Sequence, residues 1–352
     1  MNKYCKCDYV WDFSDGAAKV KMGGKYGFVD TTGHEIVPCK YDDAFDFQEG
    51  LARVESGGKW GYIDKSGREV IPCIYCQAYD FSDGLAKVYL EIIESKRFFI
   101  DKSGEEVLTA GKEWDVFQEG LARITRNNKT GFVNKEGKEV IPCKYDGAAM
   151  FCEGMTSVCE DHLLPEEEQT DEIDYYSTYG YIDKNGREVT PCKYDDANSF
   201  HEGLALVKLD GKFGFIDKTG CEVIPLQYDS AYDFHDGLAC VRTQNFYGFI
   251  DKSGLEVLNL AEHGIVVADS FSEELAVALS EPGGKRGYID KTGKFVIPCK
   301  YDEASAFHDG CALIHDGNDR YYFIDKKGRE IDISIHVDNT PKPEKADDGL
   351  PF

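Results

Sequence analysis

The sequence lacks any long hydrophobic run. No apolar stretch among its 352 residues approaches the roughly 18 residues that a membrane-spanning helix needs. The first residues, Met1 to Asp8, also lack the apolar segment of an export signal. We therefore expect neither a membrane span nor secretion of the chain as given.

Basic residues are scarce relative to acidic ones. The chain has 65 Asp and Glu against 40 Lys and Arg, which gives a formal net charge of −25. Binding to a phosphate backbone needs a basic face, so this balance argues against nucleic acid and anionic membranes as partners. Its simplest role is to keep a β-rich protein soluble and to suppress self-association.

The motifs of common enzyme and cofactor sites are also absent. There is no Gly-x-Ser-x-Gly, no Walker or Rossmann glycine loop, no His-Glu-x-x-His and no EF-hand spacing. The histidines form no metal-binding pattern, and three of them, His201, His235 and His308, occupy one tolerant turn position of a repeat. We expect no catalytic residue, no metal site and no cofactor.

Cysteine is abundant, but it is not arranged as a metal site. One repeat position, directly after proline, holds Cys39, Cys73, Cys143, Cys192 and Cys299, and Leu226 fills it in another repeat. A position that accepts Cys or Leu is a small buried apolar site. The Cys73-x-x-Cys76 spacing has no second pair at zinc-ribbon distance. Thirteen cysteines with no pairing pattern fit a reducing cytoplasm best.

A short hairpin motif dominates what is present. Between Lys59 and Pro72, the segments 60–64 and 68–71 are rich in aromatic and β-branched residues, as strands are. The Asp64-x-x-Gly67 between them predicts a tight turn, with Asp opening it and Gly taking a positive φ. Turn capping also explains the aspartates at the equivalent positions without a catalytic role.

Copies of this hairpin recur along the chain, mostly at intervals of 34 residues. The closing glycines are Gly33, Gly67, Gly104, Gly137, Gly186, Gly220, Gly254, Gly293 and Gly328. A second marker, Phe-x-(Glu/Asp)-Gly, begins at Phe13, Phe47, Phe81, Phe117, Phe151, Phe200, Phe234 and Phe307, with a degenerate copy at Phe271. Such a period indicates an array of stacked supersecondary units.

Each unit reads as a three- or four-stranded antiparallel meander. In the unit 41–72, Trp60 and Tyr62 lie on one face of a strand and Ile63 on the other, so both faces are apolar. Sheets of this kind must be sandwiched between copies of themselves, as in propellers and β-solenoids. No unit is split between the termini, and nine blades would make a large ring. The pattern therefore slightly favours an open superhelical β-solenoid, with a closed β-propeller as the alternative.

We predict one array of nine repeats over residues 1–335. An acidic insertion, about 160–177, lengthens one hairpin into a solvated protrusion. Residues 336–352 contain few apolar side chains and predict a disordered tail. The units around 85–117 and 255–271 lose the Pro-Cys segment and are irregular.

The repeat resembles the WG (or KWG) repeat of bacterial proteins. Lys-Trp-Gly-Tyr-Ile-Asp at 59–64, its variants at 25–30 and 212–217, and the Gly-x-Glu-Val-Ile-Pro-x-x-Tyr-Asp and Phe-x-Glu-Gly-Leu-Ala-x-Val segments carry the likeness, which covers about residues 7–335. Only Trp60 keeps the name-giving tryptophan. The resemblance implies a β-repeat protein that mediates interactions, and it implies no defined reaction.

One variable repeat position suggests a binding surface. It lies between the Tyr-Asp and Phe markers, is aromatic in several units, and is followed there by Asp: the candidates are Trp11, Phe45, Tyr79 and Tyr232 with Asp12, Asp46, Asp80 and Asp233. Aromatics beside acids can hold a basic or extended peptide or stack on sugar rings, although they can also simply pack on the next unit. We predict a non-enzymatic scaffold for protein or peptide partners. The alternatives are a propeller-type hydrolase or lyase with a central acidic site, and a carbohydrate-binding module.

Overall fold

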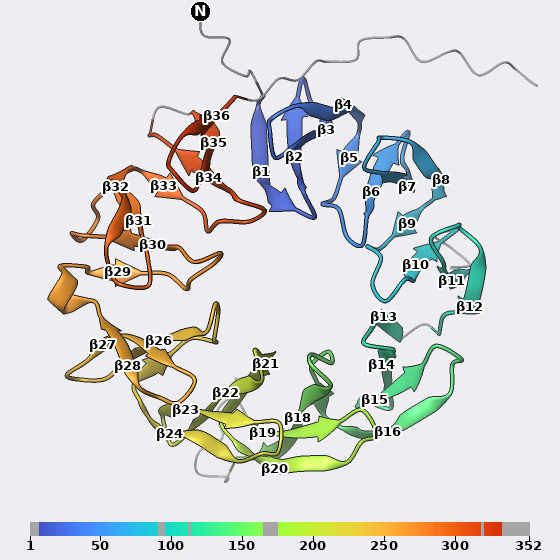
Figure 1. Cartoon of the computed structure of the whole chain (residues 1–352). Helices are drawn as coiled ribbons and strands as arrows, with labels where there is room; N and C mark the ends of the chain where they lie inside the picture. Colours follow the sequence, from blue (N-terminus) through green and yellow to red (C-terminus); the bar gives the residue numbers. More distant parts are fainter. Residues whose placement is uncertain (1–6, 91–95, 112–113, 165–174, 318–319, 333–352) are drawn as a thin grey trace, which may run out of the picture.

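The described residues form a ring of small β-sheets. The computed structural model describes residues 7–90, 96–111, 114–164, 175–317 and 320–332. These residues form nine four-stranded antiparallel sheets, in each of which the strands follow one another in chain order. Figure 1 shows the sheets as blades around a centre, with first strands such as β9 and β13 on the inside and fourth strands such as β12 and β16 at the rim. The predicted all-β array of nine meander units is confirmed.

The strands fall into blades 1 to 9 in order along the chain. Blades 1 to 3 are β1 (Tyr9–Ser14), β2 (Ala17–Met22), β3 (Lys25–Asp30), β4 (Glu35–Tyr41); β5 (Asp43–Ala44), β6 (Leu51–Ser56), β7 (Lys59–Asp64), β8 (Glu69–Tyr75); and β9 (Gln77–Ala78), β10 (Ala86–Tyr89), β11 (Arg97–Ile100), β12 (Glu106–Thr109). Blades 4 to 6 are β13 (Trp114–Gln118), β14 (Leu121–Arg126), β15 (Lys129–Asn134), β16 (Glu139–Tyr145); β17 (Gly147–Ala148), β18 (Met155–Leu163), β19 (Tyr175–Asp183), β20 (Glu188–Tyr194); and β21 (Asp196–His201), β22 (Leu204–Leu209), β23 (Lys212–Asp217), β24 (Glu222–Tyr228). Blades 7 to 9 are β25 (Ser230–Ala231), β26 (Leu238–Arg242), β27 (Tyr247–Asp251), β28 (Glu256–Asn259), followed by the 3-10 helix η1 (Ala261–His263); β29 (Val267–Ala268), β30 (Ala276–Leu279), β31 (Arg286–Ile289), β32 (Phe295–Tyr301); and β33 (Glu303–Ala304), β34 (Cys311–His315), β35 (Tyr321–Asp325), β36 (Glu330–Ile331).

The hairpin from which the repeat was recognised folds as its residues predict. The backbone N–H of Gly67 donates to the Asp64 carbonyl at 2.9 Å, and Gly67 has φ +76°. The Asp64 carboxylate caps the turn by accepting the N–H groups of Ser66 and Arg68 at 3.0 and 3.2 Å. The role of this aspartate as a turn cap is confirmed.

A glycine in the third strand makes room for a bulge in the fourth. A Cβ added to Gly61 of β7 would lie 2.5 Å from the Ile71 carbonyl oxygen and 2.7 Å from the Pro72 carbonyl carbon. The pairing register of β7 and β8 shifts on either side of this contact. Because proline cannot donate to the ladder, it is tolerated where the outermost strand bulges away.

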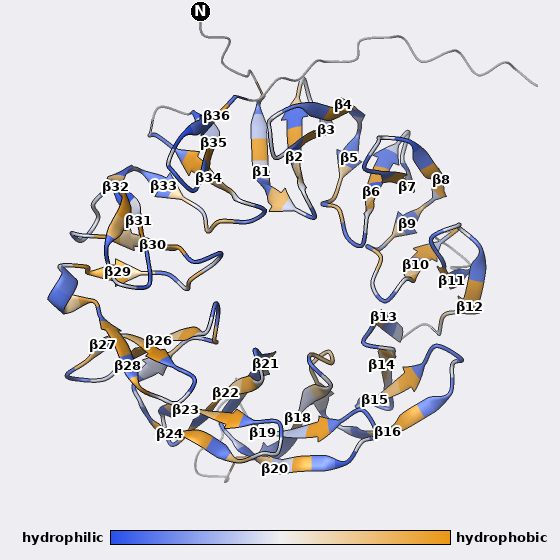
Figure 2. Cartoon of the chain, in the orientation of Figure 1, coloured by the Kyte–Doolittle hydropathy of each residue, from blue (hydrophilic) through white to orange (hydrophobic). Residues whose placement is uncertain are grey.

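Both faces of each blade are buried against neighbouring blades. In blade 2, Tyr62 packs in the cluster shared with blade 3, whereas Ile63 packs in the cluster shared with blade 1, and both side chains are fully buried. The Phe of the second marker sits against an aromatic of the preceding blade, as Phe47 does against Phe28 with ring centroids 4.8 Å apart. Such a pair adds about 0.5–1.5 kcal/mol to the burial of each ring. Figure 2 shows the apolar residues concentrated on the strands.

The array closes, so the open superhelix slightly favoured from the sequence is not the arrangement found. Blade 9 packs on blade 1 with the same contacts that join other neighbours: the Phe323 and Phe13 rings are 4.5 Å apart, and Gly16 donates its N–H to Asp309 Oδ2 at 2.8 Å. Figure 1 shows the first and last blades side by side. Closure needs no blade shared between the termini, because an ordinary blade interface fits there.

Parts of the predicted domain layout lie outside the described residues. These are the tail 336–352 and the centre of the insertion, 165–174. The described flanks of the insertion extend β18 and β19 into a long hairpin, in which Leu163 pairs with Tyr175.

Candidate functional site

Turns of one type surround the centre of the ring. Each joins the first two strands of a blade and holds the acid of the Phe-x-(Glu/Asp)-Gly marker in a left-handed conformation, with φ +52° at Asp15 and +51° at Glu49. The carboxylate accepts a backbone N–H from the equivalent turn of the next blade, as Asp15 Oδ2 does from Gly50 at 2.8 Å. These bonds run around the whole described ring through Asp15, Glu49, Asp83, Glu119, Glu153, Glu202, Asp236, Glu273 and Asp309.

A lysine from the hairpin of the next blade adds a second partner to many of these acids. Lys65 Nζ lies 2.7 Å from Asp15 Oδ1, and Lys184 Nζ lies 2.9 Å from Glu119 Oε2. The hydrogen bond from Lys65, helped by the Gly50 amide and opposed by burial, holds the pKa of Asp15 below its usual value. The Asp15 carboxylate is therefore an ionised group that joins two blades. His201, His235 and His308 directly precede the joining acids on these inner turns, and His235 and His308 are exposed, as expected for a surface turn.

Three of the four predicted aromatic residues form a row on consecutive blades. Trp11, Phe45 and Tyr79 lie on or directly after the first strands of blades 1, 2 and 3. Phe45 and Tyr79 are 38% and 41% exposed, so packing against the neighbouring blades does not bury them fully. Cations link the row: Lys19 Nζ lies 4.8 Å from the Trp11 centroid and 5.5 Å from the Phe45 centroid. We call these three residues the aromatic row.

The Arg53 guanidinium lies closest to the row. Its central carbon is 3.6 Å from the Phe45 centroid and 5.3 Å from the Trp60 centroid. The same guanidinium donates to Asp80 Oδ1 at 2.9 Å and to the Ala78 carbonyl. Arg53 therefore contacts the rings of Phe45 and Trp60 in its own blade and the Asp80 carboxylate and Ala78 carbonyl in the next blade.

The acids predicted beside the aromatics mostly have partners within the protein. Asp46 Oδ1 lies 3.6 Å from Lys19 Nζ, and Asp80 pairs with Arg53. Burial raises the pKa of Asp80, and the nearby Arg53 opposes this rise. Both carboxyl side chains still expose about two fifths of their surface, 43% and 38%. Asp12 is exposed at the start of the row.

Tyr232 and Asp233 do not belong to the row. They lie in blade 7, four blades beyond Tyr79, and Tyr232 is 62% exposed. Asp233 Oδ2 accepts a hydrogen bond from Asn198 Nδ2 of blade 6 at 2.9 Å, so an amide replaces the cation found in the row. The structure brings together three of the predicted pairs and separates the fourth.

The cations of the row were missed from sequence, although their signal is present. The third residue of the Leu-Ala-x-Val segment is basic in the first four blades, as Lys19, Arg53, Lys87 and Arg123. In the other five blades it is Ser157, Leu206, Cys240, Val277 and Leu313. Lys87 is only 7% exposed, and its ammonium donates to the Trp114 carbonyl. Aligning this position beside the aromatic one would have located the row.

The described residues contain neither a cluster of metal-binding side chains nor a membrane-spanning helix. No group of three or more His, Cys, Asp or Glu among them is arranged to hold a metal ion. No helix in the described part of the chain is long and apolar enough to cross a membrane.

Comparison with known proteins agrees with the repeat pattern. A family model described as "WG containing repeat" matches the chain seven times, at residues 4–26, 26–60, 60–91, 131–161, 179–213, 213–245 and 287–318. The matches leave out residues 92–130 and 246–286, which contain the irregular outer strands of blades 3 and 7, β12 and β28. No curated protein matches the chain.

Solved structures share the architecture at low sequence identity. A eukaryotic initiation factor is 11% identical, with a TM-score of 0.57, over 90% of this chain and 96% of its own. BamB from Moraxella catarrhalis is 10% identical over 79% and 95%, with a TM-score of 0.36. Virginiamycin B lyase from Staphylococcus aureus is 17% identical over 64% and 84%, with a TM-score of 0.30. The first likeness shows the fold alone, and the other two carry no argument.

Proposed function

Because this chain belongs to the family of proteins built from WG-containing repeats and closes into a nine-bladed propeller, we propose that it is a non-enzymatic scaffold whose aromatic row binds an extended segment of another protein. The observation that carries the proposal is the exposure of Phe45 and Tyr79 on the inner side of neighbouring blades. Rings on rigid strands lose little conformational entropy when a partner covers them.

The chemistry around the row favours a basic partner segment. Asp46 and Asp80 remain partly exposed beside the rings, and the whole chain carries a net charge of −25. Acidic surroundings draw in Lys and Arg side chains, whose cationic heads bind carboxylates and whose alkyl stems pack on aromatic rings.

The inner acids support a structural role better than a catalytic one. Each accepts a backbone N–H of the next blade, and lysines such as Lys65 and Lys184 hold several of them as anions. A general acid needs a carboxyl group that keeps its proton near neutral pH, which requires a raised pKa. The pKa values of Asp15, Glu119 and Glu153 are lowered.

We also propose that the protein resides in the cytoplasm. In support, Cys240 and Cys311 are buried and form no disulfide with another described cysteine. Buried thiols that stay reduced are usual in a reducing compartment.

The test uses labelled short peptides with Lys at alternate positions and matched peptides with Gln in their place. We expect the native chain to bind the Lys set more tightly at low salt, and Phe45→Ala with Tyr79→Ala to weaken binding by about tenfold or more. Tyr232→Ala is the matched control, since it occupies the same repeat position outside the row. Fluorescence anisotropy measures binding, and circular dichroism checks that each variant is folded.

Two outcomes would reject the proposal. Equal binding by the native chain and the double variant would remove the row as the site. Binding of soluble oligosaccharides, abolished by the double variant while peptides do not bind, would assign the row to carbohydrate instead.

A further inference from the structure

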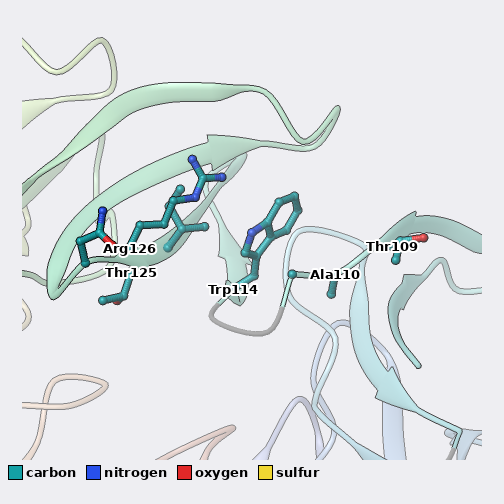
Figure 3. Close-up of a pocket in the computed structure, with 8 residues that line it drawn as sticks. Thr109, Ala110, Trp114, Thr125 and Arg126 are labelled. Atoms are coloured by element: carbon teal, nitrogen blue, oxygen red, sulfur yellow. The ribbon is translucent and has the colours of Figure 1, made fainter. Parts of the chain in front are cut away.

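The larger of two cavities between blades lies at the interface of blades 3 and 4 and has a volume of about 680 Å³. Figure 3 shows the Trp114 indole between Arg126 of β14 on one side and Ala110 on the other. Gly111 and Trp114 both line this cavity, and residues 112–113 between them lie outside the described residues. We therefore propose no ligand for it.

The smaller cavity lies between blades 8 and 9, and we call it the blade 8–9 pocket. Its volume is about 210 Å³, below the roughly 300–1,000 Å³ of sites for drug-sized ligands, so it suits a smaller molecule. Its polar lining consists of Arg286 of β31, Glu303 of β33, Ser305, His315 of β34 and Tyr321 of β35. Ala304 and Leu313 complete the lining.

The lining stops short of the tip of its hairpin. His315 and Tyr321 pair across β34 and β35, and the N–H of Asp316 donates to the Arg320 carbonyl at 3.3 Å as the next pair. Residues 318–319, which lie outside the described residues, come only after that pair in the hairpin. Every residue that lines the pocket therefore has described neighbours in the chain.

Two short side chains account for the space. At the interface of blades 2 and 3, the positions equivalent to Ser305 and Leu313 hold Tyr79 and Lys87. There the Tyr79 ring centroid lies 6.1 Å from that of Tyr89 and 5.6 Å from Lys87 Nζ, so the chain fills its own interface. Serine and leucine do not reach as far, and a cavity is left between blades 8 and 9.

The backbone at the pocket is nevertheless placed as in blade 3. The Ser305 carbonyl accepts the Tyr288 hydroxyl at 2.8 Å, as the Tyr79 carbonyl accepts the Tyr62 hydroxyl at 2.6 Å. The Ser305 hydroxyl donates to the Ala306 carbonyl at 3.1 Å, so the backbone satisfies it. The pocket is therefore the place of a missing side chain and does not come from a displaced blade.

The charges of the pocket distinguish it from other interfaces with a short side chain. Ala149 and Asn198 also take the place of Tyr79, in blades 5 and 6. The positions equivalent to Arg286 and Glu303 hold Thr130 and Gly147 between blades 4 and 5, and Tyr179 and Asp196 between blades 5 and 6. Of these three interfaces, only that of blades 8 and 9 brings a cation and an anion to these positions.

Neither charge of the pocket is neutralised at close range. Arg286 is half-buried, and no described residue accepts a hydrogen bond from its guanidinium. Asp269 of the same blade interacts with it electrostatically, but no hydrogen bond joins the two. The Glu303 side chain is 66% exposed, and its Oε2 lies 3.9 Å from His315 Nδ1, beyond hydrogen-bond distance. Both charged groups are therefore available to opposite charges of a ligand.

We propose that the blade 8–9 pocket binds a free α-amino acid with a small apolar side chain. The Arg286 guanidinium donates to the carboxylate, and the Glu303 carboxylate accepts hydrogen bonds from the ammonium group. The apolar side chain packs on Leu313 and on the Tyr321 ring, which is stacked on His315 with centroids 4.6 Å apart. A zwitterion has no net charge, so the net charge of −25 does not oppose it as it would oppose an anion.

The first test titrates L-valine into the full chain, with valinamide and N-acetylvaline as analogues that each lack one of the two charges. Ligand-observed NMR measures binding. We expect a dissociation constant on the order of millimolar for valine, as for a ligand of few atoms. Each analogue should bind about tenfold more weakly, since charge-assisted hydrogen bonds are the stronger ones. Valine binding that is absent, or no tighter than that of either analogue, would overturn the proposal.

Substitutions of the two charged residues then locate the binding. Arg286→Met and Glu303→Gln should each weaken valine binding by about tenfold. The controls make matching changes at the equivalent positions of other blades, Arg97→Met in blade 3 and Asp196→Asn in blade 6, and should leave valine binding unchanged. Equal losses in the controls would reject the site.

Ser305→Tyr tests the space itself. It restores the side chain that Tyr79 has in blade 3, so its ring should fill the pocket and abolish valine binding, while circular dichroism shows that the variant is folded. Unaltered valine binding in the folded variant would reject the proposal.

The site is separate from the aromatic row and does not depend on the function proposed for it. Phe45→Ala with Tyr79→Ala should therefore leave valine binding unchanged. Loss of valine binding in this double variant would place the amino acid at the row and reject the blade 8–9 pocket as its site.

Discussion

Two parts of the ring place different side chains at the same position of the blade interface. In blades 1 to 4, the first arc, the third residue of the Leu-Ala-x-Val segment is Lys or Arg; in blades 5 to 9, the second arc, it is Ser, Cys or aliphatic. Arg53 of the first arc bonds to Asp80 and to the Ala78 carbonyl of the next blade. Leu206 of the second arc is 5% exposed and packs in the cluster between blades 6 and 7.

The difference shows that the cations are not needed to close the ring. Blade interfaces of both arcs keep the aromatic pair and the inner hydrogen bond, as Phe28–Phe47 and Phe215–Phe234, both at 4.8 Å, illustrate. Burying a cation costs desolvation free energy that an aliphatic residue does not incur. A feature that is dispensable for the fold, costly, and confined to the arc with the aromatic row fits a role in holding the rings and acids of the row in place for a partner.

The largest loss of stability is expected from a substitution in the second arc. Leu206→Ala should lower the free energy of unfolding by about 2–5 kcal/mol, because a buried leucine leaves a cavity when truncated. Urea denaturation at low and high salt measures it, and the loss should be the same in both, since no charge changes. A strong salt dependence would show that the second arc also relies on charged contacts.

A substitution in the first arc should lower the free energy of unfolding by less, and this loss should depend on the salt concentration. Arg53→Met is expected to cost about 1–2 kcal/mol, since it leaves Asp80 and the Ala78 carbonyl without their donor, and the partial exposure of Asp80 limits the loss. The matched control is the double variant with Asp80→Asn, which should recover part of that loss. Additive losses from the two substitutions, at any salt concentration, would contradict the pairing.

Lys87→Met replaces a cation of the first arc with an uncharged side chain, as found at this position in the second arc. We expect a change within about 1 kcal/mol at neutral pH, because the buried ammonium contacts a carbonyl and aromatic rings and, among the described residues, no carboxylate lies at hydrogen-bond distance from it. Burial lowers the pKa of Lys87 below its usual 10.5. The unfolded chain therefore holds this proton more tightly, and the native protein gains stability as pH rises through the folded pKa towards 10.5.

The variant lacks this gain. The stability of Lys87→Met relative to the native protein should therefore be highest below the folded pKa of Lys87 and fall as the pH rises towards 10.5. Thermal unfolding across this range measures the difference. Parallel curves for the two proteins would show that Lys87 is not desolvated in the folded state.

Local chemistry was readable from the sequence, whereas closure was not. The Asp64-x-x-Gly67 turn, the meander and the two apolar faces of Tyr62 and Ile63 follow from residues close together in the chain. Closure depends on small rotations between blades that add up around the ring, and no single repeat reveals them. The hydrogen bond from Gly16 to Asp309 joins positions 293 residues apart.

The candidate site was predictable in part, for a related reason. Alignment of repeats found the variable aromatic position, and exposure of Phe45 and Tyr79 agrees with its freedom from packing. Treating the repeats as equivalent also placed Tyr232 in the same row, although it lies in blade 7. Arg53 belongs to blade 2 and its partner Asp80 to blade 3. An alignment of the repeats compares equivalent positions within units, so it does not show which residues of neighbouring blades meet.

The smallest expected effect is at the interface where the two arcs meet. The hairpin of each blade except the first carries a lysine after its capping residue, as Lys65 and Lys326 show, and Lys65 bonds to the inner acid of the preceding blade. Blade 1 has Thr31 there, beside the turn that carries Asp309.

Thr31→Lys should add about 0.2–1 kcal/mol to the free energy of unfolding at low salt, as an exposed ion pair does. Since the pair requires Asp309, the gain should vanish in an Asp309→Asn background and at high salt, and chemical denaturation of the four proteins measures the coupling. A gain that survives Asp309→Asn would mean that the added lysine does not act through Asp309, and the lysine–acid contact of the other interfaces would then not extend to the closing one.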